Sequence, residues 1–334
     1  MHTFKFLVAP LLGLCFLLSS CGVDKDRARF EGKISSINNA EFYIFSEEGA
    51  FEGVDTIRIE DGKFVYERKA LEPVLVTMLY PNYTQAHVIL EPGKTIKMKG
   101  DASKLGVASI TGSEQNELLT EFRQKHANDN EKTTLIAAEE FVRSHATTQA
   151  AVSVFRRYFA DRKQVQSQTA LQLLDVLCEA QPHSRIVEYI DDFFRPIFNN
   201  SVGNKLTDFK FETIDGKTKN LSDYQKQDKN LVIACVGLWQ NDTHKFMREL
   251  NQKMKKAGKN WTCLIVSMDF DVKAIRTHVK RDSLNYDIVC DRQAFESPIV
   301  RELGLHYVPS CMIINAEGTI VQRDVMKVDE AQIK

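Results

Sequence analysis

The spacing of apolar residues changes twice along this 334-residue chain, and each spacing predicts a different architecture. Residues 29–112 carry apolar side chains at every second position, which is typical of half-buried β-strands. Residues 113–200 carry them at helical spacing, and residues 205–334 alternate apolar strands with helices. We therefore expect an N-terminal antiparallel β-sandwich, then a small helical region, then a C-terminal α/β domain.

The strands predicted within residues 29–112 are short and separated by turn residues. Thr56–Glu60 and Lys63–Glu67 flank the pair Asp61-Gly62, which favours a two-residue hairpin turn. No cluster of His, Cys or carboxylate residues at the spacing of metal ligands occurs in this region. We interpret it as a domain for structure or recognition.

The region 113–200 is expected to form four or five short helices. Ala151, Phe155 and Phe159 fall on one helical face. Aromatic residues at this spacing belong to a core far more often than to a cofactor site, so we read them as core. The segment Asn199–Asn204 is the predicted linker to the C-terminal domain.

The start of the chain has the features of a secretory leader. Met1–Lys5 is weakly positive, and the thirteen largely apolar residues of Phe6–Leu18 follow it. A run of this length is too short to span a membrane, which takes ~20 residues, but it suits the core of a signal peptide. We therefore assign residues 1–20 to a signal peptide and residues 21–28 to a polar tether.

The end of this leader, Leu18-Ser19-Ser20-Cys21, resembles the lipobox of bacterial lipoproteins. The resemblance implies that Cys21 is acylated and becomes the first residue of the mature protein. The alternative is an ordinary secretory signal in which Cys21 is incidental. A lipid anchor would place the protein in the cell envelope, on the periplasmic face or outer membrane of a Gram-negative-type bacterium.

Charge and composition exclude several kinds of protein. Lys and Arg number 44 against 45 Asp and Glu, which argues against nucleic-acid binding, because phosphate contacts need a clustered positive surplus. No Cys-x-x-Cys occurs among the seven cysteines, so a zinc ribbon and a disulfide-rich scaffold are both excluded. Glycine-rich phosphate loops and His-x-x-x-His pairs are absent too, so we expect no cofactor and no metal.

Five segments in the C-terminal region carry a family resemblance. In order, they are Phe211–Lys217, Leu221–Tyr224, Leu231–Trp239, Val266–Asp269 with Asp291, and Tyr307–Gly318. Their order and spacing resemble a thioredoxin-like domain of the envelope thiol-disulfide oxidoreductases of the TlpA/ResA type. The resemblance implies a thioredoxin-like α/β fold and, at the level of the family, a place in cell redox homeostasis. The N-terminal half resembles the uncharacterised β-rich domain that precedes such thioredoxin domains in many lipoproteins.

The chain departs from this family at the residues that carry its chemistry. Where the family has Trp-Cys-x-x-Cys, this chain has Trp239-Gln240-Asn241-Asp242-Thr243. Gln240 replaces the attacking cysteine and Thr243 the resolving one, and neither side chain can exchange a disulfide. The site is therefore degenerate, with no catalytic residue at the motif positions. Pro309 falls where the family has a cis-proline beside its active site.

The other cysteines are the possible substitutes for the missing pair. They are Cys178 on an apolar helix, and Cys235, Cys263, Cys290 and Cys311 on or at the end of predicted strands. Buried free cysteines behave as small hydrophobes and are usually inert. The sequence does not exclude a bridge between two of them, because it gives no Cα separations.

Two function classes remain open at the level of sequence. The first is a membrane-tethered, non-catalytic module that binds an envelope polypeptide in a groove, or serves as a scaffold. The second is a redox protein that uses a single unconventional cysteine or assists a partner oxidoreductase, and a peroxidase ranks behind both. We favour the first, because a retained cis-proline surface without thiols suits backbone pairing with a peptide. The predicted groove residues are Trp239, Gln240, Asn241, Val308 and Pro309.

Overall fold

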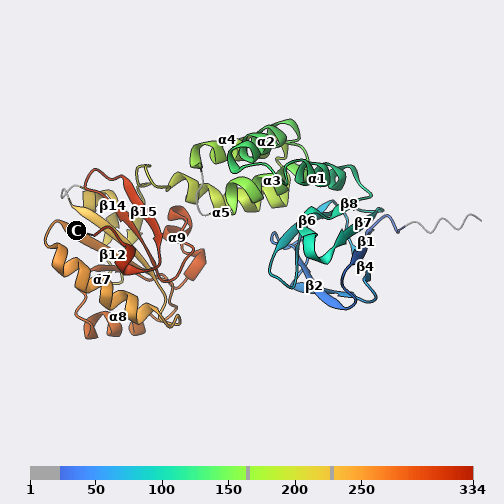
Figure 1. The fold of residues 1–334 in the computed structure, drawn as a ribbon. Coiled ribbons are helices and arrows are strands. Elements are labelled where there is room, and N and C mark those ends of the chain that lie inside the picture. Colours follow the sequence, from blue (N-terminus) through green and yellow to red (C-terminus); the bar gives the residue numbers. More distant parts are fainter. Residues whose placement is uncertain (1–22, 163–165, 226–228, 334) are drawn as a thin grey trace, which may run out of the picture. The chain divides into compact units, whose positions relative to one another are not determined.

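The computed structural model describes residues 23–162, 166–225 and 229–333, so the predicted signal peptide and Cys21 lie outside the described residues. Contacts within the chain divide it into two compact units. The first contains the β-strands up to residue 111 and the helix α1, except for the short loop 47–50. The second contains the remaining helices and the C-terminal α/β domain (Figure 1).

The first unit consists of two four-stranded sheets, with strand orders β4-β1-β7-β8 and β3-β2-β5-β6. The alternating sequence pattern is reproduced in the strands: Ile57 and Ile59 are buried, whereas Arg58 between them is exposed. The elements are β1 (Arg27–Ser35), β2 (Ala40–Phe45), β3 (Val54–Ile59), β4 (Lys63–Lys69), β5 (Val74–Leu79), β6 (Gln85–Leu90), β7 (Thr95–Asp101), η1 (Ala102–Val107), β8 (Ser109–Thr111) and α1 (Glu114–Lys125). This confirms a β-rich N-terminal region built of sheets.

Two details differ from the prediction of a purely antiparallel region. Strands β1 and β7 pair in parallel, a relation that hydrophobic alternation does not encode. The Asp61-Gly62 turn is present, with both residues at positive φ, but β3 and β4 belong to different sheets. The isolated β-bridge between Glu60 and Lys63 closes the turn, which passes the chain from one sheet to the other.

The helical part of the second unit follows the predicted spacing. Ala151, Phe155 and Phe159 are all buried, as one apolar face requires. The side chains of Asn130 and Thr148 cap the helices that follow them by accepting backbone N–H bonds. The elements are α2 (Glu131–Ser144), α3 (Gln149–Phe155), the π-turn η2 (Arg156–Ala160), α4 (Ser167–Ala180) and α5 (Arg185–Asn199).

The C-terminal domain is built on a five-stranded sheet of order β13-β12-β11-β14-β15. Strands β11, β12 and β13 are parallel to one another, β14 pairs antiparallel with β11, and β15 pairs antiparallel with β14. Side chains from α7 and α8 cover one face and those from α9 the other, which gives the thioredoxin-like arrangement of layers (Figure 1). The elements are β9 (Lys210–Glu212), β10 (Thr218–Asn220), α6 (Ser222–Gln225), β11 (Asn230–Val236), α7 (Thr243–Ala257), β12 (Trp261–Ser267), α8 (Val272–Arg281), β13 (Asp287–Val289), η3 (Ala294–Glu296), α9 (Pro298–Leu303), β14 (Ser310–Ile314), β15 (Ile320–Val325) and η4 (Val328–Glu330).

The predicted linker Asn199–Asn204 is tied to the domain that follows it. Asn200 is fully buried, and its side-chain amide donates to the carbonyl oxygens of Pro196 and Glu302. The Gly203 backbone N–H donates to the Ile320 carbonyl at 2.8 Å. Helix α5 is therefore docked on the α/β domain.

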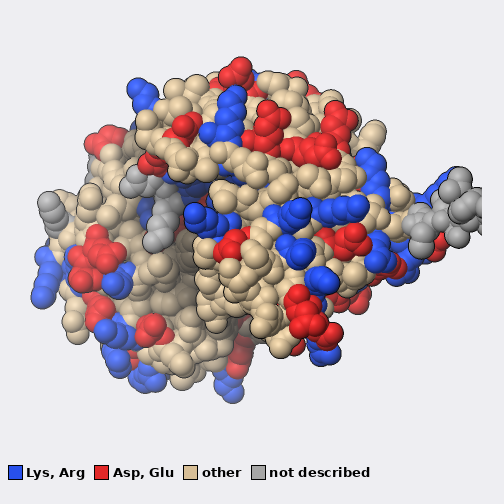
Figure 2. Space-filling view, turned by 45° about the vertical axis from the view of Figure 1, so that its right-hand side comes forward, with Lys and Arg blue, Asp and Glu red and all other residues tan. Residues whose placement is uncertain are grey.

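Acidic and basic side chains share the surface. Figure 2 shows both signs of charge across the visible face, as the overall balance of 44 to 45 leads one to expect. Within the described ranges, no helix has the length and apolar character that crossing a membrane requires.

Candidate functional site

Strand register brings three loops together at one edge of the C-terminal sheet. Val236 at the end of β11 pairs with Ser267 at the end of β12, and Cys235 pairs with Ser310 at the start of β14. Because β14 runs antiparallel to β11, the segment before Ser310 meets the segments after Val236 and Ser267. The predicted groove residues 239–241 and 308–309 therefore lie at the same edge.

Each of these three loops exposes an aromatic side chain. Trp239 is 59% exposed, Phe270 69% and Tyr307 44%. Of these three, only Trp239 is among the groove residues predicted from the sequence. Their position was available as a signal, because each lies three residues from a strand end at this edge. Exposed aromatic side chains are enriched where proteins bind other polypeptides.

A buried carboxylate supports the Trp239 loop. Asp269 accepts a hydrogen bond from the Leu238 backbone N–H at 2.9 Å and another from the Ser267 hydroxyl at 2.7 Å. The Trp239 ring lies against the backbone of Gly237, where an added Cβ would be 2.6 Å from the indole nitrogen. These contacts hold Trp239 in one place although its ring faces solvent.

The predicted motif positions lie at the beginning of α7. Gln240 is half-buried before the first turn, Asn241 is exposed, and Thr243 is the first helical residue and fully buried. The Thr243 hydroxyl donates to the Gly237 carbonyl at 2.8 Å. Asp242 is the N-cap residue of α7, but its side chain forms no capping hydrogen bond.

The Val308–Pro309 peptide bond is cis, as the family resemblance implied. Pro309 is buried and Val308 half-buried. The Gln240 side-chain amide donates to the Val308 carbonyl at 3.5 Å, and its oxygen accepts the Asn241 backbone N–H at 3.1 Å. The primary amide of Gln240 therefore contacts the cis-proline loop.

The cysteines in the described part of the chain are all free. Burial raises the pKa of Cys235 and of Cys311 to about 12. Burial also raises the pKa of Cys178, Cys263 and Cys290, and the Cys290 thiol donates to the Asp269 carbonyl at 3.1 Å. A reactive cysteine needs a lowered pKa and access to solvent. None of these five thiols has a lowered pKa.

His244, which follows the motif, packs against His278 of α8 with 4.7 Å between ring centroids. Burial lowers the pKa of His278. Among the described residues, no group of three or more His, Cys, Asp or Glu side chains is arranged to hold a metal ion.

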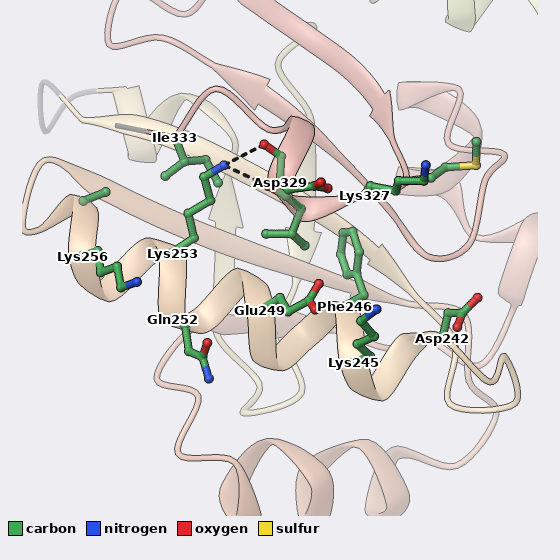
Figure 3. Close-up of a pocket in the computed structure, with 13 residues that line it drawn as sticks. Asp242, Lys245, Phe246, Glu249, Gln252, Lys253, Lys256, Lys327, Asp329 and Ile333 are labelled. Atoms are coloured by element: carbon green, nitrogen blue, oxygen red, sulfur yellow. Dashed lines mark hydrogen bonds and ion pairs between the residues drawn. The ribbon is translucent and has the colours of Figure 1, made fainter.

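A separate groove of about 830 Å³ lies between α7 and the C-terminal segment (Figure 3). Asp242 is the one motif residue in its lining. Lys253 crosses the groove and donates to the carbonyl oxygens of Val328 and Ala331, at 2.9 and 2.6 Å. The charged side chains that line it are of both signs, and no His or Cys is among them.

Two family models match the chain. Residues 202–323 match the AhpC/TSA family, and residues 28–119 match DUF4369, a domain of unknown function. The resemblance inferred from the sequence is thereby confirmed: a thioredoxin-like domain follows an uncharacterised β-rich domain. No curated protein matches the chain.

Solved structures similar to the C-terminal part are thiol-disulfide proteins. A thiol-disulfide oxidoreductase from Bacteroides fragilis is 25% identical, with a TM-score of 0.33, and the match covers 37% of this chain and 91% of that one. The thioredoxin domain of a thiol-disulfide oxidoreductase from Bacteroides vulgatus is 15% identical (TM-score 0.33; 37% and 89% covered). A thiol:disulfide interchange protein of the thioredoxin family from Chlorobium tepidum is 16% identical (TM-score 0.33; 38% and 88% covered).

Proposed function

We propose that this chain, whose thioredoxin-like domain matches the AhpC/TSA family, binds an extended polypeptide at the sheet edge described above and does not exchange disulfides. The observation that carries the proposal is that neither Gln240 nor Thr243, at the start of α7, has a thiol. Disulfide exchange begins with attack by a thiolate. An amide cannot perform this step, and the hydroxyl of Thr243 is buried against the Gly237 carbonyl.

The remaining cysteines supply no substitute in this proposal. Burial raises the pKa of each described cysteine, so thiolate is scarce at neutral pH. A single-cysteine mechanism would need a thiol whose pKa is lowered. This argues against the alternative of a redox protein that acts through one unconventional cysteine.

The features suited to peptide binding are retained. Exposed Trp239, Phe270 and Tyr307 offer apolar contact area, and the loop before the cis-proline offers backbone groups beside them. An extended peptide that pairs with such a backbone gains main-chain hydrogen bonds, and its side chains reach neighbouring apolar surfaces.

The test measures binding and redox turnover in the same preparation. We expect the full-length protein, purified in detergent, to bind a fluorescent unfolded peptide by anisotropy and to leave insulin disulfides intact. Trp239→Ala should weaken binding, whereas Phe295→Ala, which removes an exposed aromatic ring in η3, should not. Insulin reduction by the unaltered protein, or equal affinity after Trp239→Ala, would contradict the proposal.

We further propose that acylation of Cys21 anchors the protein to a membrane of the cell envelope. The apolar core Phe6–Leu18 and the small residues before Cys21 support this assignment. Metabolic labelling with an alkyne-tagged fatty acid should mark the protein and its Cys15→Ala variant, but not Cys21→Ala. Label retained in Cys21→Ala would show that another residue is acylated, and no label on the unaltered protein would leave an ordinary secretory leader; either result contradicts the proposal.

A further inference from the structure

The outward face of one sheet in the first unit is rich in basic side chains. Phe30, Phe64 and Ile96 are buried on the inner side of β1, β4 and β7, so the residues that alternate with them point outward. Strand register places the outward residues of β1 beside those of β4 and β7. We call this surface the basic face; its basic residues are Arg27, Arg29, Lys33, Lys63, Lys69, Lys97 and Lys99, and its acidic residues are Glu31, Glu67 and Asp101.

Three lysines form a row across the basic face. Lys33 of β1 pairs in register with Lys63 of β4 on one side and with Lys99 of β7 on the other. All three are exposed, and among the described residues none of them forms an ion pair with a carboxylate. Neighbouring strands lie ~4.8 Å apart, and like charges on directly opposite residues destabilise a sheet. An anionic ligand that lies over the row would relieve this repulsion.

The chain enters the domain on the same face. Val23 and Asp24, where the described part of the chain begins, line a groove of about 470 Å³ together with Arg29 and Lys97 of the basic face. The Asp24 carbonyl accepts a hydrogen bond from the backbone N–H of Arg27 at 2.9 Å, at the start of β1. Cys21 is two residues before Val23, and two extended residues span at most ~7 Å. The residue proposed to carry the lipid is therefore adjacent to the basic face.

We propose that the basic face binds the anionic headgroups of the membrane that holds the lipid anchor, with the sheet lying flat on the bilayer. This inference rests on the proposed acylation of Cys21, which brings Val23 to within a Debye length of the headgroups, ~10 Å. Lys33 lies ~20 Å beyond Arg27 along β1, so the row of lysines reaches the headgroups only in the flat orientation. The anchor then supplies attachment, and the basic face sets the orientation of the domain.

The first experiment omits the anchor, so that it measures the basic face alone. The mature chain, residues 21–334 with Cys21→Ala, is sedimented with vesicles of phosphatidylcholine that contain either no phosphatidylglycerol or one-third phosphatidylglycerol. We expect binding to the anionic vesicles only, and weaker binding at higher salt. The combined variant Lys33→Gln, Lys63→Gln and Lys99→Gln should bind about 5-fold more weakly for each lysine removed.

A second combined variant is the matched control. Lys255→Gln, Lys256→Gln and Lys259→Gln remove the same charge from exposed lysines at the end of α7 and just after it. This variant should bind the anionic vesicles as the unaltered chain does. Circular dichroism and thermal unfolding verify that both combined variants fold.

The second experiment tests the orientation of the acylated protein. The protein is reconstituted into the same two kinds of vesicle and treated with an amine-reactive acetylating reagent, and the modified lysines are identified by mass spectrometry. We expect Lys33, Lys63 and Lys99 to react more slowly in the anionic vesicles, and Lys255 to react equally in both. Equal reaction of the row in both kinds of vesicle would overturn the flat orientation.

The remaining outcomes also decide the inference. Equal binding to both kinds of vesicle, or an equal loss in the two combined variants, would overturn it. Tighter binding of a poly-glutamate peptide than of anionic vesicles, lost in the variant of the row, would assign the face to an acidic polypeptide and overturn it too. Absence of fatty-acid label on Cys21 would contradict the proposed anchor alone, because the vesicle assay does not use the anchor.

Discussion

The hydroxyl of Thr243 donates a hydrogen bond of 2.8 Å to the carbonyl oxygen of Gly237, across the loop that joins β11 to α7. In the proposed function, Thr243 takes the position of the resolving cysteine. Its side chain is fully buried, and the hydroxyl serves to hold the loop. The bond closes the turn that presents Trp239 and Gln240.

Replacing Thr243 by Val should therefore destabilise the domain. Valine has the same shape but lacks the hydroxyl donor, while the Gly237 carbonyl keeps its bond from the Gln240 backbone N–H at 3.0 Å, so the loss is that of one hydrogen bond, ~0.5–1.5 kcal/mol. We expect the free energy of unfolding, measured by urea denaturation, to fall by this amount. Thr243→Ser, which keeps the hydroxyl, should lose less. An equal loss in both variants would show that packing of the methyl group dominates.

Restoring the thiol pair should restore the chemistry of the motif. In Gln240→Cys with Thr243→Cys, the first thiol lies just before α7, where free backbone N–H groups and the helix dipole stabilise a thiolate. Its pKa should fall from ~8.5 into the range ~3.5–7.5, as measured by ultraviolet absorbance of the thiolate. We expect this double variant to form a reducible disulfide and to reduce insulin.

The single variants provide the control for that prediction. Gln240→Cys alone should titrate but complete no dithiol turnover, because no resolving thiol follows it. A double variant that folds and yet forms no reducible disulfide would show that Gln240 and Thr243 are not at the motif positions.

The docking of α5 depends on Gly304. This residue has φ of +61°, and an added Cβ would lie 2.7 Å from Ile197 Cγ1 and 2.8 Å from the Ile197 backbone nitrogen. Gly304→Ala should destabilise the protein by more than the ~1 kcal/mol that positive φ alone costs alanine. Gly203→Ala is the control, since Gly203 has φ of +94° with nothing near its added Cβ. Similar melting temperatures for the two variants would rule out a role of this close approach.

The layers of the fold were predictable because they follow from local periodicity. The buried strand β11 and the alternating strands of the first unit match the patterns in the sequence. The sheet to which each strand belongs was not predictable. The Asp61-Gly62 turn would have the same sequence whether β3 and β4 paired with each other or belonged to different sheets, as they do. The parallel pairing of β1 with β7 depends on contacts between residues far apart in the chain.

The candidate site was predictable where the family motif names positions, and less so elsewhere. Trp239 and the cis bond at Pro309 followed from the motif. The support from Asp269 and the hydrogen bond from Arg323 to the end of α5 depend on tertiary contacts across 31 and 126 residues. The burial of Asn200 was not predictable either, because the linker is polar in composition. Its amide is buried with hydrogen bonds to backbone carbonyl groups, and these partners cannot be identified from the sequence.

The buried thiols should make the protein unreactive at neutral pH and less stable at high pH. A thiol with a pKa of about 12, as for Cys235 and Cys311, is a thiolate roughly 1000 times less often at pH 8 than one with the ordinary value near 9. We expect a disulfide reagent such as DTNB to label these thiols at least that much more slowly in the native protein than in urea.

The sign of the pH effect follows from the same shift. Because the folded state holds these protons more tightly than the unfolded state, their contribution to stability is complete below pH 9 and is lost as pH rises from 9 toward 12. Urea denaturation at pH 8, 9 and 10 should therefore show a falling free energy of unfolding, with a smaller fall in Cys235→Ala.

Cys178 is the least buried of the five and should react first, so Cys178→Ser should remove the earliest phase of labelling. Fast native labelling that persists in Cys178→Ser and disappears in Cys311→Ser would instead favour a single-cysteine redox protein.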